Sequence, residues 1–138
     1  MPLASFFLGY RRTALETGEI LTAIEIPKPL PERIAFYKVS KRRLDDISTV
    51  AAAIAIDRNG GRVRRARFAL GGVAATPVRV VEAETAIEGQ FWDQSAVEHV
   101  QQIFDGALAP LTDHRGSSAY RREVSKSLVE KFWWEYGR

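Results

Sequence analysis

Cysteine is absent from this chain of 138 residues, and histidine occurs only twice. Without cysteine the chain has no disulfide, no thiolate zinc site and no cysteine-ligated iron–sulfur cluster of its own. His99 and His114 lie far apart, without carboxylates at the spacing of metal ligands, so we expect both at the surface. We therefore predict no metal site here, and any associated metal chemistry belongs to other domains.

Long hydrophobic runs are also missing. No segment approaches the roughly 20 apolar residues that a membrane helix needs. The first residues lack the basic start of a secretory signal, and Arg11 and Arg12 soon interrupt the apolar residues. A composition of 46% hydrophobic and 27% charged residues is typical of a globular domain with one core. We expect a cytoplasmic protein without a membrane segment.

Motifs that would make a complete active site are not found. The sequence has no G-x-S-x-G elbow, and His114 near Ser117 is weak support for a triad. Asp45 and Asp46 are adjacent, so in an extended segment they point to opposite sides and do not flank one reacting atom. Neither pair of adjacent glycines belongs to a nucleotide-binding motif. We predict no catalytic residue and no complete cofactor site within the chain.

The pattern changes near Pro77 from strand-like alternation to helical spacing. We predict strands over 19–26, 33–40, 48–57 and 62–70, and helices from Pro77 to Gly89, over 95–108, and from a Ser117 cap to Phe132. Asn59-Gly60-Gly61 is a hairpin turn between the last two strands, and Thr76 caps the first helix. Strands grouped before helices predict an α+β sandwich with a three- to four-stranded, mainly antiparallel sheet and three helices on one face.

The strand over 48–57 has two different faces. One carries the branched residues Val50, Ile54 and Ile56, and the other carries Thr49 and three alanines. Small side chains let a helix approach closely, so the alanine face is a candidate for helix packing.

Two basic segments are candidates for anionic partners. FYKVSKRRLDDIS, from Phe36, places four cations and two carboxylates between strand-like runs, and RVRRAR, from Arg62, clusters four arginines. In a half-buried strand, Arg65 and Arg67 fall opposite Phe68 and no aromatics interleave to stack bases. We therefore favour a solvated strand face over nucleic-acid binding.

Five blocks in order resemble the C-terminal domain of the flavin subunit of xanthine dehydrogenases and related molybdenum hydroxylases, including carbon monoxide dehydrogenases. They are FFLGYRRTAL from Phe6, EILTAIEIP from Glu19, FYKVSKRRLDDIS from Phe36, GGVAATPVR from Gly71 and APLTDHRGSSAYRR from Ala109. The third and fifth are most similar to bacterial xanthine dehydrogenase small subunits.

The resemblance implies a part of a larger oxidoreductase. In such enzymes a molybdenum cofactor oxidises a purine, 2Fe-2S clusters relay electrons, and FAD passes a hydride to NAD. Residues 1–31 would be the end of the upstream FAD-binding domain with a connecting strand, and 32–138 the C-terminal domain that covers one side of FAD. The implied partners are the upstream FAD-binding and 2Fe-2S domains and the molybdenum-binding large subunit, in purine catabolism. The isolated chain is not expected to be active.

The resemblance also names site residues. Leu21 and Lys38 match positions that contact FAD; from the residues alone, Leu21 also fits packing under the following prolines, and Lys38 also fits pairing with a carboxylate. The segment from Lys41 to Asp46 matches a mobile loop near the flavin, where Arg42 and Asp45 would influence its electrostatics. Leu44 departs from the acidic residue common there in animals, which leaves that role open.

Two alternatives accompany this interpretation. One is a stand-alone interaction or nucleic-acid-binding module, motivated by the basic segments, whose binding would be salt-sensitive. The other keeps the family and changes the enzyme to a carbon monoxide or aromatic-compound dehydrogenase.

Overall fold

A computed structural model describes residues 1–44 and 46–137. The chain divides into two compact units, Met1–Leu30 and Pro31–Arg138, and each is described by itself. No helix in these described ranges is long and apolar enough to cross a membrane.

The N-terminal unit contains a single turn of 3-10 helix and a small hairpin. The turn is η1 (Leu3–Ser5), and the hairpin pairs β1 (Phe7–Gly9) with β2 (Arg12–Thr13) in antiparallel orientation. The predicted strand over 19–26 is wrong, because this segment has no regular secondary structure. Its isoleucines alternate, but Ile20 is 79% exposed and Ile24 is 66% exposed. Alternation supplies an apolar face, whereas a strand also needs a neighbour to pair its N–H and C=O groups.

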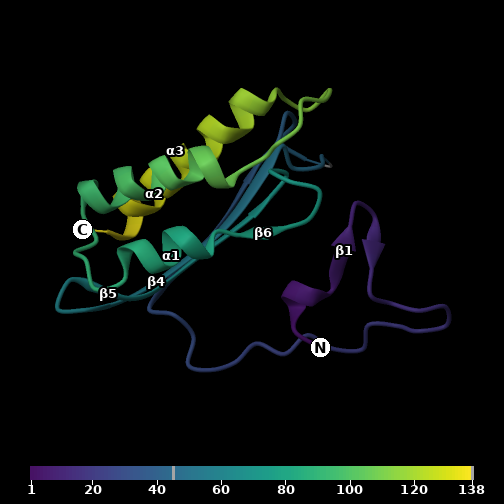
Figure 1. The fold of residues 1–138 in the computed structure, drawn as a ribbon, viewed down its shortest axis with the longest axis horizontal. Coiled ribbons are helices and arrows are strands. Elements are labelled where there is room, and N and C mark those ends of the chain that lie inside the picture. Colours follow the sequence, from purple (N-terminus) through teal and green to yellow (C-terminus); the bar gives the residue numbers. More distant parts are fainter. Residues whose placement is uncertain (45, 138) are drawn as a thin grey trace. The chain divides into compact units, whose positions relative to one another are not determined.

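The C-terminal unit is an antiparallel sheet with helices on one face (Figure 1). The strand order is β3-β4-β5-β6, and every pairing is antiparallel. The strands are β3 (Arg33–Val39), β4 (Val50–Asn59), β5 (Arg62–Gly71) and β6 (Val78–Arg79), and the helices are α1 (Val81–Ile87), α2 (Gln94–Ala107) and α3 (Ser118–Tyr136). The predicted α+β sandwich is confirmed.

The two glycines between β4 and β5 determine the conformation of the turn. Gly60 and Gly61 have φ values of +58° and +80°, and Asn59 pairs with Arg62 across the turn. A two-residue hairpin with positive φ at both positions matches the right-handed twist of the strands. The predicted hairpin at this position is therefore confirmed.

The start of the first helix differs from the prediction. Thr76 and Pro77 precede the short strand β6, and α1 begins only at Val81. The exposed edge of β5 offers hydrogen-bond partners, so the chain pairs Val78 with Leu70 and continues with the N–H of Val80 donating to Phe68 at 3.0 Å. Pairing with the sheet edge thus displaces the helix start by one short strand.

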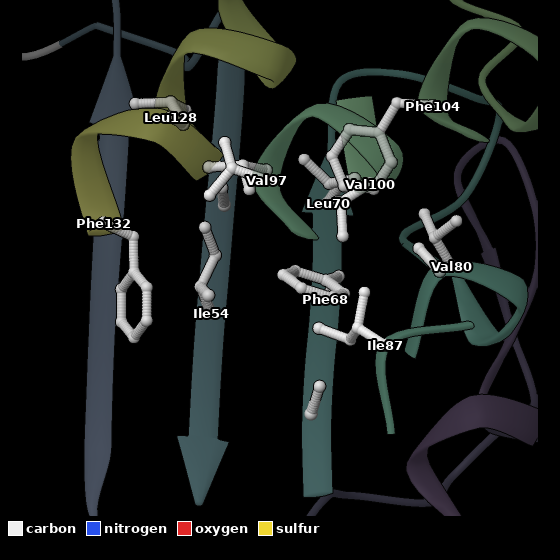
Figure 2. Packing of buried hydrophobic residues seen from close by; sticks show 14 of the residues in the cluster. Ile54, Phe68, Leu70, Val80, Ile87, Val97, Val100, Phe104, Leu128 and Phe132 are labelled. Carbon is white, nitrogen blue, oxygen red and sulfur yellow. The ribbon is translucent and has the colours of Figure 1, made fainter. Parts of the chain in front are cut away.

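The core lies between the branched face of the sheet and the helices (Figure 2). Phe68 of β5 is fully buried and meets Phe104 of α2 edge-on, with ring centroids 5.9 Å apart. Ala66 and Leu70 are also buried, as predicted for their strand. The labelled residues of the core are Ile54, Phe68, Leu70, Val80, Ile87, Val97, Val100, Phe104, Leu128 and Phe132. The helices pack on the branched face of β4, so the prediction that its alanine face receives a helix is wrong.

Candidate functional site

The face of the sheet opposite the helices is the candidate site, and we call it the open sheet face. Side chains alternate along each strand, and the register aligns those that point away from the helices. They are Ile34, Phe36 and Lys38 from β3, Ala51, Ala53 and Ala55 from β4, Arg67, Ala69 and Gly71 from β5, and Arg79 from β6.

The open sheet face is apolar in its middle. Phe36 is 67% exposed and Ile34 is 58% exposed, although both lie on a regular strand. The register places Phe36 beside Ala53, which in turn pairs with Ala69. At the other side, Arg79 contacts Glu84. A broad surface of small side chains with large exposed apolar groups at one edge is suited to a flat partner.

Lys38 lies on the open sheet face, where it pairs in register with Ala51. Its side chain is exposed. In the described part of the chain its ammonium makes no hydrogen bond and no ion pair. A neighbouring carboxylate was the alternative partner for Lys38, and no described carboxylate takes that role.

Leu21 belongs to the N-terminal unit and lies in the segment without regular structure. Its side chain is 57% exposed, so it is available for an apolar contact. Lys38 belongs to the other unit. That Leu21 and Lys38 contact the same cofactor stays a prediction.

The loop after β3 is organised by Asp46. The N–H of Arg42 donates to Asp46 Oδ2 at 2.9 Å, and the Arg42 guanidinium lies 3.9 Å from Oδ1. The backbone hydrogen bond from Arg42, aided by the charge of its guanidinium, lowers the pKa of Asp46 below its ordinary value. Asp45 lies outside the described residues, and the predicted influence of Arg42 and Asp45 on a flavin stays a prediction.

A buried arginine that sequence reasoning did not single out holds the neighbouring loops. Arg121 of α3 is 4% exposed. Its guanidinium donates to the carbonyls of Thr49 and Gly72 and to Asp113 Oδ1, the last at 2.6 Å. The guanidinium of Arg121 thereby joins three segments: the residue before β4, the loop after β5 and the loop before α3.

The sequence does contain a signal for this role. Arg121, Leu128 and Phe132 follow one another at helical spacing, and all three are buried. A cation on the core-facing stripe of a helix needs enclosed partners, because an unpaired buried charge is costly.

Asp57 uses two of the arginines in the segment RVRRAR. Arg64 and Arg65 both contact Asp57 Oδ2, at 3.3 and 2.8 Å. The register shifts here, since Asp57 pairs with Arg65 but Arg58 pairs with Val63. The extra residue of this bulge lets two consecutive arginines reach one carboxylate.

The other two arginines of that segment also have partners within the domain. Arg67 lies 3.4 Å from Glu84, and the Arg62 guanidinium lies over the ring of Phe91 at 4.1 Å from its centroid. Because all four arginines of RVRRAR contact side chains of the domain itself, we favour a structural role for this segment over nucleic-acid binding. Among residues 1–44 and 46–137, no group of three or more His, Asp or Glu side chains is arranged to hold a metal ion.

The model of the CO dehydrogenase flavoprotein C-terminal domain matches residues 35–136. The chain belongs to this family. It is 34% identical to nicotinate hydroxylase hnxS of Emericella nidulans, over 96% of the chain and 10% of that relative. It is 35% identical to xanthine dehydrogenase of Calliphora vicina, over 93% of the chain and 10% of the relative. The solved structure of reconstituted CO dehydrogenase from Oligotropha carboxidovorans is similar with a TM-score of 0.83 and 32% identity, over 92% of the chain and 44% of that chain.

The family membership confirms the resemblance predicted from the five sequence blocks. Both kinds of relative named in that prediction, a xanthine dehydrogenase and a CO dehydrogenase, are among the matches. The CO dehydrogenase flavoprotein C-terminal domain thus accounts for most of the chain. The chain spans about a tenth of the two curated relatives and less than half of the structurally similar chain.

Proposed function

We propose that the open sheet face of this domain covers one side of an FAD that is held mainly by an upstream domain. The observation that carries the proposal is an apolar sheet face with large exposed side chains and a lysine that has no partner in the described part of the chain, in a member of a flavoprotein family. Small side chains leave room for a planar ring system to approach the backbone closely. The domain has no complete catalytic site of its own and works as part of a larger oxidoreductase.

The residues present fit the isoalloxazine ring of a flavin. Its faces are apolar and its edge carries carbonyl oxygens, so Phe36 and Ala53 suit the faces and the Lys38 ammonium suits an oxygen. Leu21 provides a second apolar contact. When bound, FAD receives electrons from 2Fe-2S clusters and passes a hydride to NAD.

Residues 1–31 belong, in this proposal, to the end of the upstream FAD-binding domain and a connecting strand. The boundary between compact units falls at Leu30 and Pro31. The exposed, alternating isoleucines over 19–26 support the same division, because a segment with a strand pattern and no pairing is suited to a strand of another domain.

The proposed complex is a xanthine dehydrogenase-like molybdenum hydroxylase of the cytoplasm. The 2Fe-2S clusters and molybdenum cofactor belong to partner domains, NAD is the acceptor, and a purine is the substrate. The relatives are named for nicotinate, xanthine and carbon monoxide, so an aromatic compound or carbon monoxide is the alternative substrate. The molybdenum-binding subunit decides between them.

Lys38→Met in the complete flavin subunit tests the contact with FAD. We expect weaker FAD retention and a more negative flavin potential, because a cation near the ring stabilises its reduced, more negative form. A unit charge about 4 Å away is worth roughly 4 kcal/mol at an effective dielectric of 20, or about 90 mV for a two-electron couple, and about a quarter of that in water. Fluorescence of released FAD and a redox titration measure both effects.

Lys131→Met is the matched control, because Lys131 lies on α3, where it pairs with Glu135. It should leave FAD retention and flavin potential unchanged. Equal behaviour of the two variants would remove Lys38 from the proposal.

The complex itself is tested by recovering it from source cells with an antibody to this domain. A colourless chain without a large partner would contradict the proposed assembly.

A further inference from the structure

A cavity of about 370 Å³ lies in the C-terminal unit at the N-terminal end of α3. Lys41 reaches it from the loop after β3, and Arg115, Gly116, Ser117 and Tyr120 reach it from the loop before α3 and the helix itself. Its volume falls in the range of small-ligand sites.

Arg115 is the distinctive residue of this cavity. Its backbone is fixed at both ends, since its N–H donates to Asp113 Oδ1 at 2.8 Å and its C=O accepts from Thr49 Oγ1 at 3.2 Å. Its guanidinium makes no hydrogen bond or ion pair in the described part of the chain, and its Nε atom is buried without a partner. An anchored backbone that carries an unpaired cation into a cavity calls for an anion.

Lys41 supplies the second cation. Its ammonium donates to the carbonyl oxygen of His114, which fixes its position and leaves two of its three N–H groups for other partners. Of the carboxylates that the structure describes in these two loops, Asp113 pairs with Arg121 and Asp46 pairs with Arg42. Within residues 1–44 and 46–137 neither Lys41 nor Arg115 pairs with a carboxylate, so both cations are available to an anionic ligand.

Ser117 adds a neutral donor. Its hydroxyl oxygen accepts from the N–H of Tyr120 at 3.1 Å as the cap of α3, so its own proton is available to a ligand. The 19-residue helix that begins there adds a favourable field for negative charge. The half-exposed ring of Tyr120 gives the cavity one apolar wall.

We propose that this cavity binds the phosphoryl group of a small phosphate ester. Lys41, Arg115 and Ser117 line the cavity and each carries a hydrogen-bond donor, and a phosphoryl group presents three peripheral oxygens to accept from them. A phosphoryl group carries a charge of about −1.5 to −2 at pH 7, so it matches two cations better than a singly charged carboxylate does. The wall formed by Tyr120 suits the ribose or base of a nucleotide. The inference does not depend on a flavin at the open sheet face.

The test is a calorimetric titration of the 138-residue chain with ADP and, separately, with adenosine. We expect saturable binding of ADP, and no binding of adenosine at the same concentrations. Arg115→Gln and Lys41→Gln should each weaken ADP binding about tenfold, the effect of one charge-assisted hydrogen bond. Arg115→Lys should retain part of the affinity that Arg115→Gln loses.

Arg33→Gln and Lys131→Gln remove the same charges outside the cavity and control for general electrostatic attraction. The proposal is overturned if ADP does not saturate, if adenosine binds as well as ADP, or if these controls weaken ADP binding equally. A single-stranded oligonucleotide that binds more tightly than ADP through Lys41 and Arg115 would also overturn it, because the phosphates would then belong to a nucleic acid. Far-UV circular dichroism of each variant verifies that the fold is retained.

Discussion

Gly72 shows how a single residue fixes the backbone around the buried Arg121. Its φ is +79°, and a Cβ at this position would lie 2.4 Å from the carbonyl oxygen of Thr49. The carbonyl of Gly72 also accepts from the Arg121 guanidinium at 2.9 Å. Both the conformation and the close approach therefore require glycine.

Gly72→Ala should destabilise the domain by more than about 1 kcal/mol, because positive φ and a backbone clash both oppose the added methyl group. Gly106→Ala in α2 is the matched control. A Cβ at Gly106 would have open space around it, with no atom within 4 Å, so alanine should raise stability by up to about 1 kcal/mol. Urea denaturation of both variants measures the two effects, and a shift of the same sign in each would contradict this explanation.

At the scale of elements, α1 is fixed to the sheet by a buried carboxylate. Glu84 is 2% exposed and accepts from the N–H of Phe68 at 3.1 Å and from Nε of Arg79 at 3.0 Å. Arg67 lies 3.4 Å from the same side chain. One side chain thus joins the short helix to β5 and β6.

Glu84→Ala should cost about 1–3 kcal/mol, because it leaves the buried N–H of Phe68 without its partner, whereas Arg79 and Arg67 are partly exposed to solvent. Glu82→Ala changes an exposed residue of the same helix and should change stability by no more than about 0.5 kcal/mol. Chemical denaturation measures the free energy of unfolding of both variants. Similar losses in the two variants would mean that α1 itself, and not the buried contact, limits stability.

Sequence patterns predicted the elements whose signal is local. The hairpin from β4 to β5 follows from alternation and its glycines, and the Ser117 cap of α3 is observed, with its hydroxyl accepting from Tyr120. The failures at 19–26 and at Pro77 share a cause, because both depend on whether a neighbouring strand is available for pairing, and periodicity within a segment does not report this.

In the candidate site, too, local features could be predicted from the sequence and contacts between distant segments could not. Alternation placed Lys38 on a face of its strand, but it did not show which face the helices cover. The helices take the branched face of β4, whose larger side chains bury more apolar area. The contacts of Arg121 join segments up to 72 residues apart, so they could not be predicted from local spacing.

At the scale of the whole molecule, acid should destabilise the C-terminal unit through its paired carboxylates. Burial would raise the pKa of Asp57, but the N–H of Glu32 and the guanidinium groups of Arg65 and Arg64 outweigh burial and lower the pKa below its ordinary value. The N–H of Arg115, followed by the Arg121 guanidinium, lowers the pKa of Asp113.

A lowered pKa in the folded state stabilises the fold above the unfolded pKa, which is about 4 for aspartate, and this stability is lost as pH falls through the folded value. We therefore expect the free energy of unfolding to decrease when the pH is lowered below about 4. Asp57→Asn should be less stable at pH 7 and show a shallower decline on acidification. Denaturation midpoints measured from pH 7 to pH 2.5 test this, and parallel curves for the two proteins would exclude Asp57 as a contributor.

The sequential order of the sheet has a consequence for the entropy of folding. Each strand from β3 to β6 neighbours the strand that follows it in the chain, so each pairing closes only a short loop. Because closure entropy increases with loop length, the sheet adds its strands at a low entropic cost. The long closures are made by α3. Glu135 accepts from the Tyr37 hydroxyl of β3 across 98 residues, and Arg121 donates to the carbonyl of Thr49, just before β4, across 72 residues. These contacts of α3 with β3 and with the residue before β4 therefore carry a larger entropic cost of chain closure than the strand pairings do, and the buried hydrogen bonds of Arg121 help to offset that cost.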